Sequence, residues 1–549
     1  MNSVKLICPL CKDSVDRLVY RFHLDSERVI VEKIKTEHPA WTETDGMCSR
    51  CIDYYHTEIV MQKHILPEIG PHYPIRSMDD FIILPTGLRL DADPRYTGKG
   101  IAICFIDSGY YPHPDLNKTS NRIKAFVDIT DVPTKSGKSN DKHMWHGTMT
   151  SVVCAGDGFL SNGLYKGIAN QSDLVLIKVQ DEEGNISTEN ISKALEWVLS
   201  HHEEYNIRII NISLAADEES SNTTTRLGLL TEQLTAEGIT IVAAVGNDVN
   251  GHIKPPANSR HVIAVGGIDD KNHLNADTKS MYHSTYGVTV DGLIKPELIA
   301  QAIWLAAPIL PDTKEYEESV ALHRLLASLD NDVNHVPSAD ELKKYMEAPL
   351  AESNDWPSIR EAIVKRIQSG KFISPHYMHV DGTSFAAPIV SAVIAQLLEV
   401  NPKLSPVMIR EILFSTAERI RGLPVEPQGY GLLQPRKAIL KALRTANRFS
   451  QYSSPAIDLQ KKTITFYVQH DSASQITLAG TFSDWSGEVL SMQPGFYGIW
   501  KIEIPILPQG KYHYKFLVDD RHWIQDVLNP YQEPDGYSGL NSVLLIPSN

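Results

Sequence analysis

Five short apolar runs constrain the fold of this chain more than any other feature. They are Gly100–Asp107, Asp173–Val179, Ile207–Leu214, Gly238–Asn247 and His261–Gly267. Continuous runs of this kind are typical of parallel strands that are buried on both faces of a sheet. Amphipathic segments at Ile191–Ser200 and Arg226–Ala236 are long enough for crossover helices. We therefore predict a doubly wound α/β domain with its functional side chains at the carboxyl ends of the strands.

Four polar side chains lie where such strands end or helices begin. Asp107 and Asn247 each close an apolar run, and His146 opens a stretch of small and apolar residues. Ser384 lies in Gly382–Pro388, which reads as a tight turn before an apolar helix. A serine hydroxyl becomes a nucleophile when a base takes its proton and fixed donors hold the oxyanion. His146 suits the base, Asp107 its orienting acid and Asn247 the oxyanion donor, although each residue alone is more often structural.

The region from about residue 90 to 447 resembles the subtilisin-like (subtilase) serine proteases. The motifs that carry this resemblance are Asp107-Ser-Gly, His146-Gly-Thr, Gly246-Asn247, Lys295-Pro-Glu-Leu-Ile-Ala300 and Gly382-Thr-Ser384-Phe-Ala-Ala-Pro388. The resemblance implies that His146 deprotonates Ser384, which attacks a peptide carbonyl to form an acyl-enzyme. Asn247 and the Ser384 backbone N–H would hold the oxyanion. No catalytic cofactor is implied.

The segments expected to bind substrate depart from the family pattern. The family's Ser-Leu-Gly-Gly reads Ser213-Leu214-Ala215-Ala216 here, so added methyl groups should narrow the pocket. Gly246 and Asp248 flank Asn247, and the Asp248 carboxylate at the rim would favour a basic residue before the scissile bond. The loop Gly158–Gly167 lacks the calcium-loop sequence of the family, so calcium binding is left open.

An insertion of about residues 303–371 precedes the serine turn. Between Ala300 and Thr383 lie 82 residues, where the family needs only a short connection. The predicted helices are Glu315–Leu329, Ser338–Met346, with Ser338 and Glu341 in capping-box register, and Ile359–Gln368. Because the insertion leads into the turn, we expect it near the substrate groove. It is either a plain elaboration or a substrate-selecting or activating lid.

Two CxxC pairs mark residues 1–70. Cys8 and Cys11 are followed, after 36 residues, by Cys48 and Cys51. Four thiolates in two pairs suit a tetrahedral, structural zinc ion, and the segment resembles a zinc ribbon. Reduced thiols or redox pairs are the alternative. Other potential ligands are His23, His38 and His56. We expect residues 71–89 to form a linker.

The C-terminal part has an all-β pattern. A Ser-rich linker at 448–458 precedes residues 459–549, whose predicted strands are Lys462–Val468, Gln475–Ala479, Gly498–Ile504, Tyr512–Val518 and Ser542–Ile546. This module resembles the immunoglobulin-like, glycogen-binding β-sandwich of starch-active enzymes and of the AMP-activated kinase beta subunit. By motif position, the residues that match sugar contacts are Trp485, Lys515, Trp523 and Asn541. The resemblance implies an α-glucan or a partner protein as ligand.

Composition narrows the functional class. The 549 residues include 52 basic and 67 acidic side chains, a net charge of −15, which argues against nucleic acid or an anionic membrane as the main partner. The first thirty residues lack a signal-peptide pattern, and six cysteines are few for a disulfide scaffold, so we expect a cytoplasmic protein. The prediction is an intracellular serine endopeptidase acting on protein or peptide. Its rivals are a catalytically silent scaffold that binds glucan or a partner and a peptide-processing transpeptidase.

Overall fold

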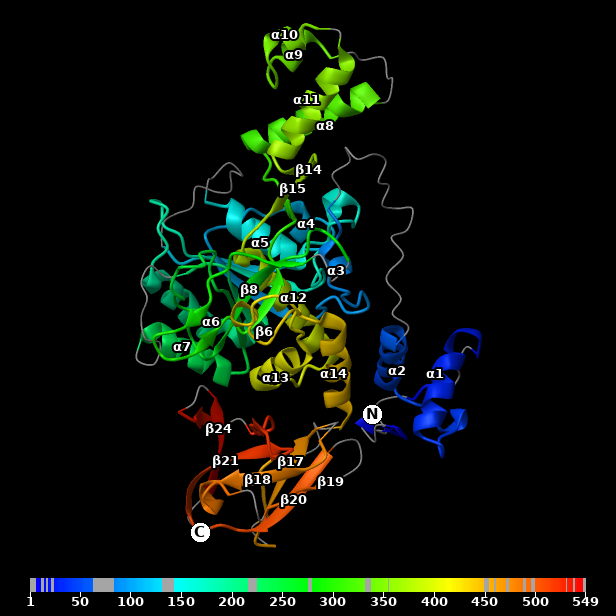
Figure 1. Cartoon of the computed structure of the whole chain (residues 1–549), viewed down its shortest axis with the longest axis vertical. Coiled ribbons are helices and arrows are strands. Elements are labelled where there is room, and N and C mark those ends of the chain that lie inside the picture. The colour runs from blue at the N-terminus through cyan, green and yellow to red at the C-terminus, as the bar shows by residue number, and fades with distance from the viewer. Residues whose placement is uncertain are drawn as a thin grey trace. The chain divides into compact units, whose positions relative to one another are not determined.

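Two compact units make up the structure, which is a computed structural model of the chain (Figure 1). The larger unit comprises residues 67–399 and 414–435, and the smaller unit comprises residues 1–66, 400–413 and 436–549. The described residues are 6–10, 14–15, 18–20, 24–62, 83–130, 143–215, 225–274, 279–330, 337–353, 355–448, 454–458, 461–470, 473–486, 490–494, 499–529, 531–536 and 539–546.

An eight-stranded sheet forms the centre of the larger unit. Its order is β12-β8-β7-β6-β3-β5-β4, with the short β9 antiparallel to β8 and all other pairs parallel. The bounds are β3 (Ala102–Asp107), β4 (Ile123–Asp128), β5 (Asp173–Lys178), β6 (Ile207–Ile212), β7 (Thr240–Ala244), β8 (Val262–Asp269), β9 (Ser280–Met281) and β12 (Leu298–Gln301). All five predicted strands are confirmed. β4 and β12 were not predicted, because β4 is a half-exposed edge strand and β12 has only four residues.

Helices cover both faces of this sheet, as predicted for a doubly wound fold. Apolar residues of α6 (Thr188–Tyr205) and α7 (Arg226–Ala236) share one core cluster with side chains such as Ile210 of β6. Asn211, the next residue of β6, points to the opposite face and accepts a hydrogen bond from Ser391 of α12 (Thr383–Val400) at 3.0 Å. In the described part of the chain, α12 alone is long and apolar enough to cross a membrane, but 89% of it is buried within the protein, as in a core helix.

Short elements connect these layers. They are α3 (Thr86–Arg89), α4 (Pro114–Asn117), α5 (Trp145–Ala155), η2 (Phe159–Ser161), the hairpin β10 (Gly287–Val288) and β11 (Ile294–Lys295), and η4 (Glu426–Gln428). α5 begins two residues after the described part of the chain resumes at His143, and all its residues from Gly147 to Ala155 are buried. α3 and the buried Ile83 lie within the stretch that was expected to be a linker.

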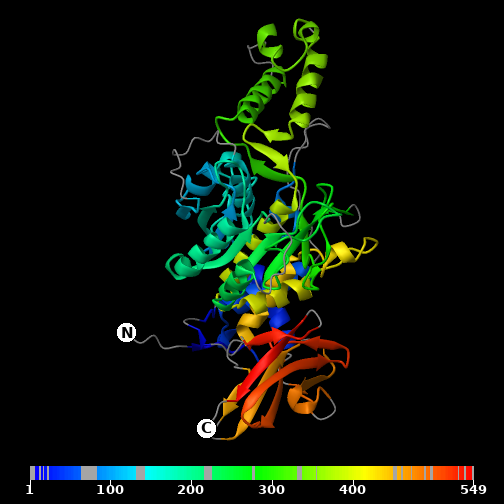
Figure 2. The same ribbon diagram turned by 90° about the vertical axis from the view of Figure 1, so that its left-hand side faces the viewer.

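The insertion forms a small subdomain with its own apolar core (Figure 2). Its elements are β13 (Leu305–Pro308), α8 (Lys314–Asp330), α9 (Ala339–Leu342), α10 (Ala348–Ala351), α11 (Trp356–Ser369), β14 (Phe372–Ser374) and β15 (Tyr377–Val380). The helices project from one end of the larger unit, beyond the antiparallel sheet β13-β15-β14. The capping box of Ser338 and Glu341 is confirmed. The helix expected to reach Met346 ends at Leu342, where the chain turns and packs Tyr345 and Met346 against this core.

The N-terminal segment and two further helices belong to the smaller unit. The hairpin β1 (Leu6–Ile7) and β2 (Ser14–Val15) is followed by α1 (Leu24–Glu37), η1 (Glu43–Asp45) and α2 (Ser49–Gln62). The zinc-ribbon-like segment therefore contains the helices α1 and α2 in addition to its short hairpin. α13 (Pro406–Thr416) begins in this unit, and α14 (Pro435–Arg448) lies almost wholly within it.

Two antiparallel sheets form the C-terminal β-sandwich. One has the order β16-β17-β20-β19, and the other has the order β18-β21-β24-β23, with β22 paired to β21. The bounds are β16 (Ala456–Asp458), β17 (Thr463–Gln469), β18 (Ile476–Gly480), η5 (Thr481–Ser483), β19 (Gln493–Pro494), β20 (Ile499–Pro505), β21 (Gly510–Val518), β22 (His522–Ile524), β23 (Gln532–Pro534) and β24 (Leu540–Ile546). Both sheets contribute to one apolar core. The five predicted strands are confirmed, and β16 lies within the stretch expected to be a linker.

Candidate active site

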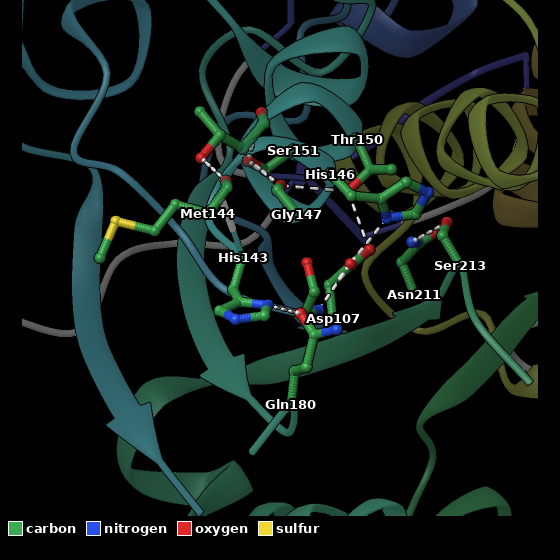
Figure 3. Close-up of polar contacts among 12 residues, drawn as sticks. Asp107, His143, Met144, His146, Gly147, Thr150, Ser151, Gln180, Asn211 and Ser213 are labelled. Atoms are coloured by element: carbon green, nitrogen blue, oxygen red, sulfur yellow. Dashed lines mark hydrogen bonds and ion pairs between the residues drawn. The ribbon is translucent and has the colours of Figure 1, made fainter. Parts of the chain in front are cut away.

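Asp107 and His146 form a hydrogen-bonded pair at the carboxyl edge of the central sheet. The His146 Nδ1 atom lies 2.7 Å from Asp107 Oδ1 (Figure 3). Because a carboxylate only accepts, Nδ1 carries the proton and Nε2 is left as the basic nitrogen. Burial alone would lower the pKa of His146, but the charge of Asp107 and this hydrogen bond raise it, and the net pKa is above the ordinary value.

The Asp107 carboxylate is itself held in place. The Ser108 N–H donates to Asp107 Oδ1 at 2.7 Å, and the Thr150 hydroxyl donates to Oδ2 at 3.2 Å. Thr150 lies one helical turn after His146 on α5, so a single helix carries both groups. Asp107 has only 1% of its surface exposed. This role of Thr150 was not predicted, although its spacing of four residues from His146 was a usable signal.

Ser384 and Asn247 meet on the other side of the site. The Asn247 side-chain oxygen accepts from the Thr383 N–H at 2.8 Å and from the Thr383 hydroxyl at 2.9 Å. This orients the amide, so that Nδ2 turns toward the serine turn. A Cβ atom built on Gly382 would lie 3.1 Å from Ser384 Oγ and 3.5 Å from Asn247 Nδ2. The hydroxyl and the amide donor therefore face the same small space.

The start of α12 brings Ser384 toward the imidazole. The ring of Phe385, the next residue, lies 5.8 Å from the His146 ring, centroid to centroid. Ser384 is the second residue of α12, whose N-terminus offers unpaired N–H groups and the positive end of the helix dipole. Gly382 has a φ of +139°, a conformation that favours glycine and lets the chain turn sharply before the helix. The four catalytic candidates are thus brought to one edge of the sheet.

Close backbone approach fixes this arrangement. Gly147, the residue after His146, packs against the Gly109 carbonyl, and an added Cβ would lie 2.4 Å from that oxygen. Gly246, before Asn247, has a φ of +113°, and an added Cβ would lie 2.7 Å from Thr285 Oγ1. Both positions therefore require glycine for packing, which explains two of the motif residues.

The predicted substrate-binding residues lie around the same edge. Ser213 follows β6, the neighbour of β3, and its hydroxyl accepts from Asn211 at 2.9 Å. Leu214 is half-buried and Ala215 is exposed, whereas Ala216 lies outside the described residues. Asp248 is exposed, but its carboxylate accepts from the Asn250 N–H at 3.0 Å. The effect of these residues on specificity stays a prediction.

The Lys295 motif stabilises the sheet and lies outside the reacting groups. The buried Lys295 ammonium donates to the Ser259 and Val262 carbonyls at 2.7 and 2.9 Å and pairs with Glu297 at 2.6 Å. The second oxygen of Glu297 accepts from the Ala264 N–H at 2.8 Å. These contacts fasten the segment before β12 to β8.

Three of the four predicted metal ligands cluster in the N-terminal segment. The Cys8 and Cys51 sulfurs are 3.9 Å apart, the Cys48 and Cys51 sulfurs are 3.6 Å apart, and all three are buried. Tetrahedral zinc with bonds of about 2.3 Å holds sulfurs about 3.8 Å apart, so this geometry fits the ion. Cys11 and His23 lie outside the described residues. His38 contacts Tyr55 at 3.1 Å, and His56 is exposed outside the cluster.

The four predicted sugar contacts lie close together on the sandwich. Trp485 and Trp523 have ring centroids 6.0 Å apart, with planes at 77°. Trp523 lies on β22 opposite Leu517 of β21, so it shares the outer face with Lys515 two residues away. The last paired residues of β21 and β24 are Tyr514 and Ser542, and Lys515 and Asn541 are the next residues along the two strands. Lys515 also forms an ion pair with Asp535 at 2.5 Å.

Comparisons with known proteins agree with this architecture. Residues 98–431 match the family model described as "Subtilase family", and residues 453–532 match "Carbohydrate-binding module 48 (Isoamylase N-terminal domain)". Serine protease AprX of Bacillus subtilis (strain 168) is 26% identical over 346 residues, which are 61% of this chain and 64% of that protein. Subtilisin Savinase of Lederbergia lenta is 28% identical over 209 residues, 38% of this chain and 68% of that protein.

A further relative is matched over a smaller share of its own length. Minor extracellular protease Vpr of Bacillus subtilis (strain 168) is 28% identical over 261 residues, 46% of this chain and 31% of that protein. The chain thus spans less than two thirds of both AprX and Vpr. Because the family model covers more than half of the chain and its motif residues meet at one edge of the sheet, the protein belongs to the subtilase family.

Proposed function

We propose that the protein is a serine endopeptidase that cleaves peptide bonds through an acyl-enzyme on Ser384. The observation that carries this proposal is the Asp107–His146 pair beside an oriented Asn247 amide and the start of α12. His146 Nε2 takes the hydroxyl proton as Ser384 attacks the peptide carbonyl, and Asn247 Nδ2 donates to the oxyanion. His146 then gives the proton to the leaving amine. Water releases the acyl group by the same steps.

A labelling experiment tests the nucleophile. A fluorophosphonate probe should label the wild-type protein and fail to label Ser384→Ala. The matched control is Ser200→Ala, because Ser200 is an exposed serine of α6 whose hydroxyl donates to the Glu196 carbonyl of the same helix. This control should be labelled as strongly as wild type. Equal labelling of wild type and Ser384→Ala would show that Ser384 is not the nucleophile, and no labelling of either protein would favour the silent scaffold.

We also infer that the C-terminal module binds α-glucan through the outer face that carries Trp485 and Trp523. Two indoles at nearly right angles can stack on successive sugar rings, and Lys515 and Asn541 can bond to hydroxyls. The 46% exposure of Trp523 supports a ligand-facing role. Trp523→Ala should abolish retention on immobilised glycogen, whereas Tyr531→Ala, at another exposed aromatic of the module, should not. Equal retention of Trp523→Ala and wild type would indicate a docking module for protein.

A structural zinc ion held by Cys8, Cys11, Cys48 and Cys51 completes the proposal. The sulfur spacing and the hydrogen bond from Cys48 N–H to Cys8 Sγ at 3.4 Å support thiolates that bind metal. Cys48 immediately precedes α2 and Cys51 lies in its first turn, where the helix dipole favours negative charge.

We also propose a reducing, cytoplasmic location, which is supported by the lack of disulfides among the five described cysteines.

A further inference from the structure

The insertion of residues 303–371 begins and ends at the turn that carries the nucleophile. Ala302, which precedes the insertion, accepts a hydrogen bond through its carbonyl from the Gly382 N–H at 2.7 Å. Lys371, its last residue, forms an ion pair with Asp381 at 2.8 Å. Asp381 and Gly382 are adjacent in the chain, and Ser384 follows two residues later. Both ends of the insertion therefore contact the serine turn directly.

The Asp381 carboxylate also contacts a part of the larger unit that lies outside the insertion. Its second oxygen accepts from the Tyr282 hydroxyl at 3.3 Å. Burial alone would raise the pKa of Asp381, but the hydrogen bond and charge of Lys371 lower it, and the net pKa is below the ordinary value. The ionised Asp381 carboxylate therefore joins the Lys371 ammonium of the insertion to the Tyr282 hydroxyl, which lies outside the insertion.

A closed set of contacts links this carboxylate to the oxyanion donor. The Tyr282 ring stacks on His283 with centroids 4.0 Å apart, and His283 Nδ1 lies 2.9 Å from the Asn247 carbonyl oxygen. The Asn247 side chain is held in turn by Thr383, two residues after Asp381. A movement of Asp381 would therefore reach Asn247 by two routes, through the serine turn and through the two stacked rings.

The insertion is rigidly connected to this set. β15 pairs with β13 from Leu305–Val380 to Pro308–Tyr377 and runs straight into Asp381. The Lys371 carbonyl accepts from the His379 N–H at 2.9 Å, and α11 ends two residues before Lys371. The base of the insertion is fixed by Arg89, which donates to the Ile303 and Trp304 carbonyls at 3.3 and 3.0 Å. A displacement of the helices would thus be carried to Lys371 and β15.

We propose that Asp381 is a positioning residue that makes the placement of Ser384 and Asn247 depend on the insertion through Lys371. Asp381 contacts no reacting atom and acts through the turn and the oxyanion amide. This inference rests on the proposed endopeptidase function and assigns the insertion a role in it. Its physical basis is that small misplacements of catalytic groups cost large factors in turnover, while a half-exposed ion pair adds little to folding stability.

The test compares three lysine variants of the full-length protein on a chromogenic peptide. Lys371→Ala should lower kcat by at least about fivefold, change KM by less than about twofold and leave the melting temperature nearly unchanged. Lys371→Arg, which keeps the charge, should restore most of kcat. The matched control is Lys365→Ala, because Lys365 lies on α11 and, among the residues that the structure describes, forms an ion pair only within its helix, with Glu361 at 2.6 Å. This control should equal wild type.

A double variant separates positioning from other roles. If Asp381 acts through Lys371, Lys371→Ala combined with Asp381→Ala should be no slower than Asp381→Ala alone. Additive losses, a kcat of Lys371→Ala within twofold of wild type, or an effect on KM alone would overturn the inference. Absence of Ser384-dependent hydrolysis in the wild type would instead refute the proposed function and this inference with it.

Discussion

Asn247 shows how a single side chain can be aimed by its neighbours. Both Thr383 donors bind its oxygen, so the Nδ2 donor faces the space beside Ser384. We expect Asn247→Ala to lower kcat by roughly 10²–10³-fold with little change in KM, which is the loss known for the equivalent donor of a subtilisin. Steady-state kinetics on a peptide substrate would check it. Asn247→Asp, which loses the donor at constant size, should be as slow, and an active Asn247→Asp variant would contradict the assigned role.

His146 sets the pH dependence expected of catalysis. Its pKa is raised by Asp107 despite burial, and only the neutral imidazole can take the Ser384 proton. The rate constant kcat/KM should therefore fall as pH decreases, with a midpoint above 6.5, the ordinary histidine value. Asp107→Asn should lower both this midpoint and the rate. A profile that is flat from pH 5 to 8 on a substrate without titrating groups would show that another base operates.

Sequence patterns predicted the longer strands that are buried along their length. They missed the features whose position depends on contacts with other elements. The buried strands β3, β5, β6, β7 and β8 read as continuous apolar runs, whereas edge strand β4 alternates and resembles a loop. The positions of the four catalytic candidates in the fold were predictable because their motifs lie at element ends. The Asp381–Lys371 pair was not, since only the antiparallel pairing of β13, β14 and β15 brings the end of the insertion beside the serine turn.

The sandwich contains a buried carboxylate that should make its stability depend on pH. Asp526 accepts from the Ser454 and Tyr514 hydroxyls at 2.5 and 2.7 Å, and burial raises its pKa to about 7. The folded state therefore keeps a proton that the unfolded chain loses near pH 4, so stability decreases as pH rises from about 4 to 7 and then levels off. The change is on the order of 1–4 kcal/mol.

Asp526→Asn isolates this effect within the same fold. Melting temperatures of the full chain from pH 5 to 8 should fall for the sandwich transition of the wild type and stay more nearly constant for the variant. Ser454 precedes β16, so the same carboxylate also ties the start of the module to β21. Parallel pH curves for the two proteins would show that Asp526 is ionised in the folded module.

At the scale of the whole molecule, the N-terminal segment belongs with α14 and the sandwich, although it is far from both in the sequence. Tyr54 of α2 accepts a hydrogen bond from Arg444 Nε of α14 at 2.8 Å, and the guanidinium lies 5.1 Å from its ring centroid. Glu58 lies 3.9 Å from the same guanidinium. A short segment with a small core thus gains a packing partner, which sequence patterns could not show because the contact joins residues 390 apart.

Metal removal should therefore loosen α14 as well as the cysteine cluster. Zinc that binds Cys48 and Cys51 fixes the first turn of α2, and α2 presents Tyr54 to Arg444. Chelation should speed amide exchange in α1, α2 and α14 and leave α6 of the other unit unchanged. Cys48→Ser should show fast amide exchange in these helices without chelator, and adding chelator should not speed it further. If zinc fixes α2, the purified reduced protein must contain about one zinc per chain, and chelation must speed its amide exchange. Far less zinc than this, or unchanged exchange after chelation, would therefore show that the segment folds without metal.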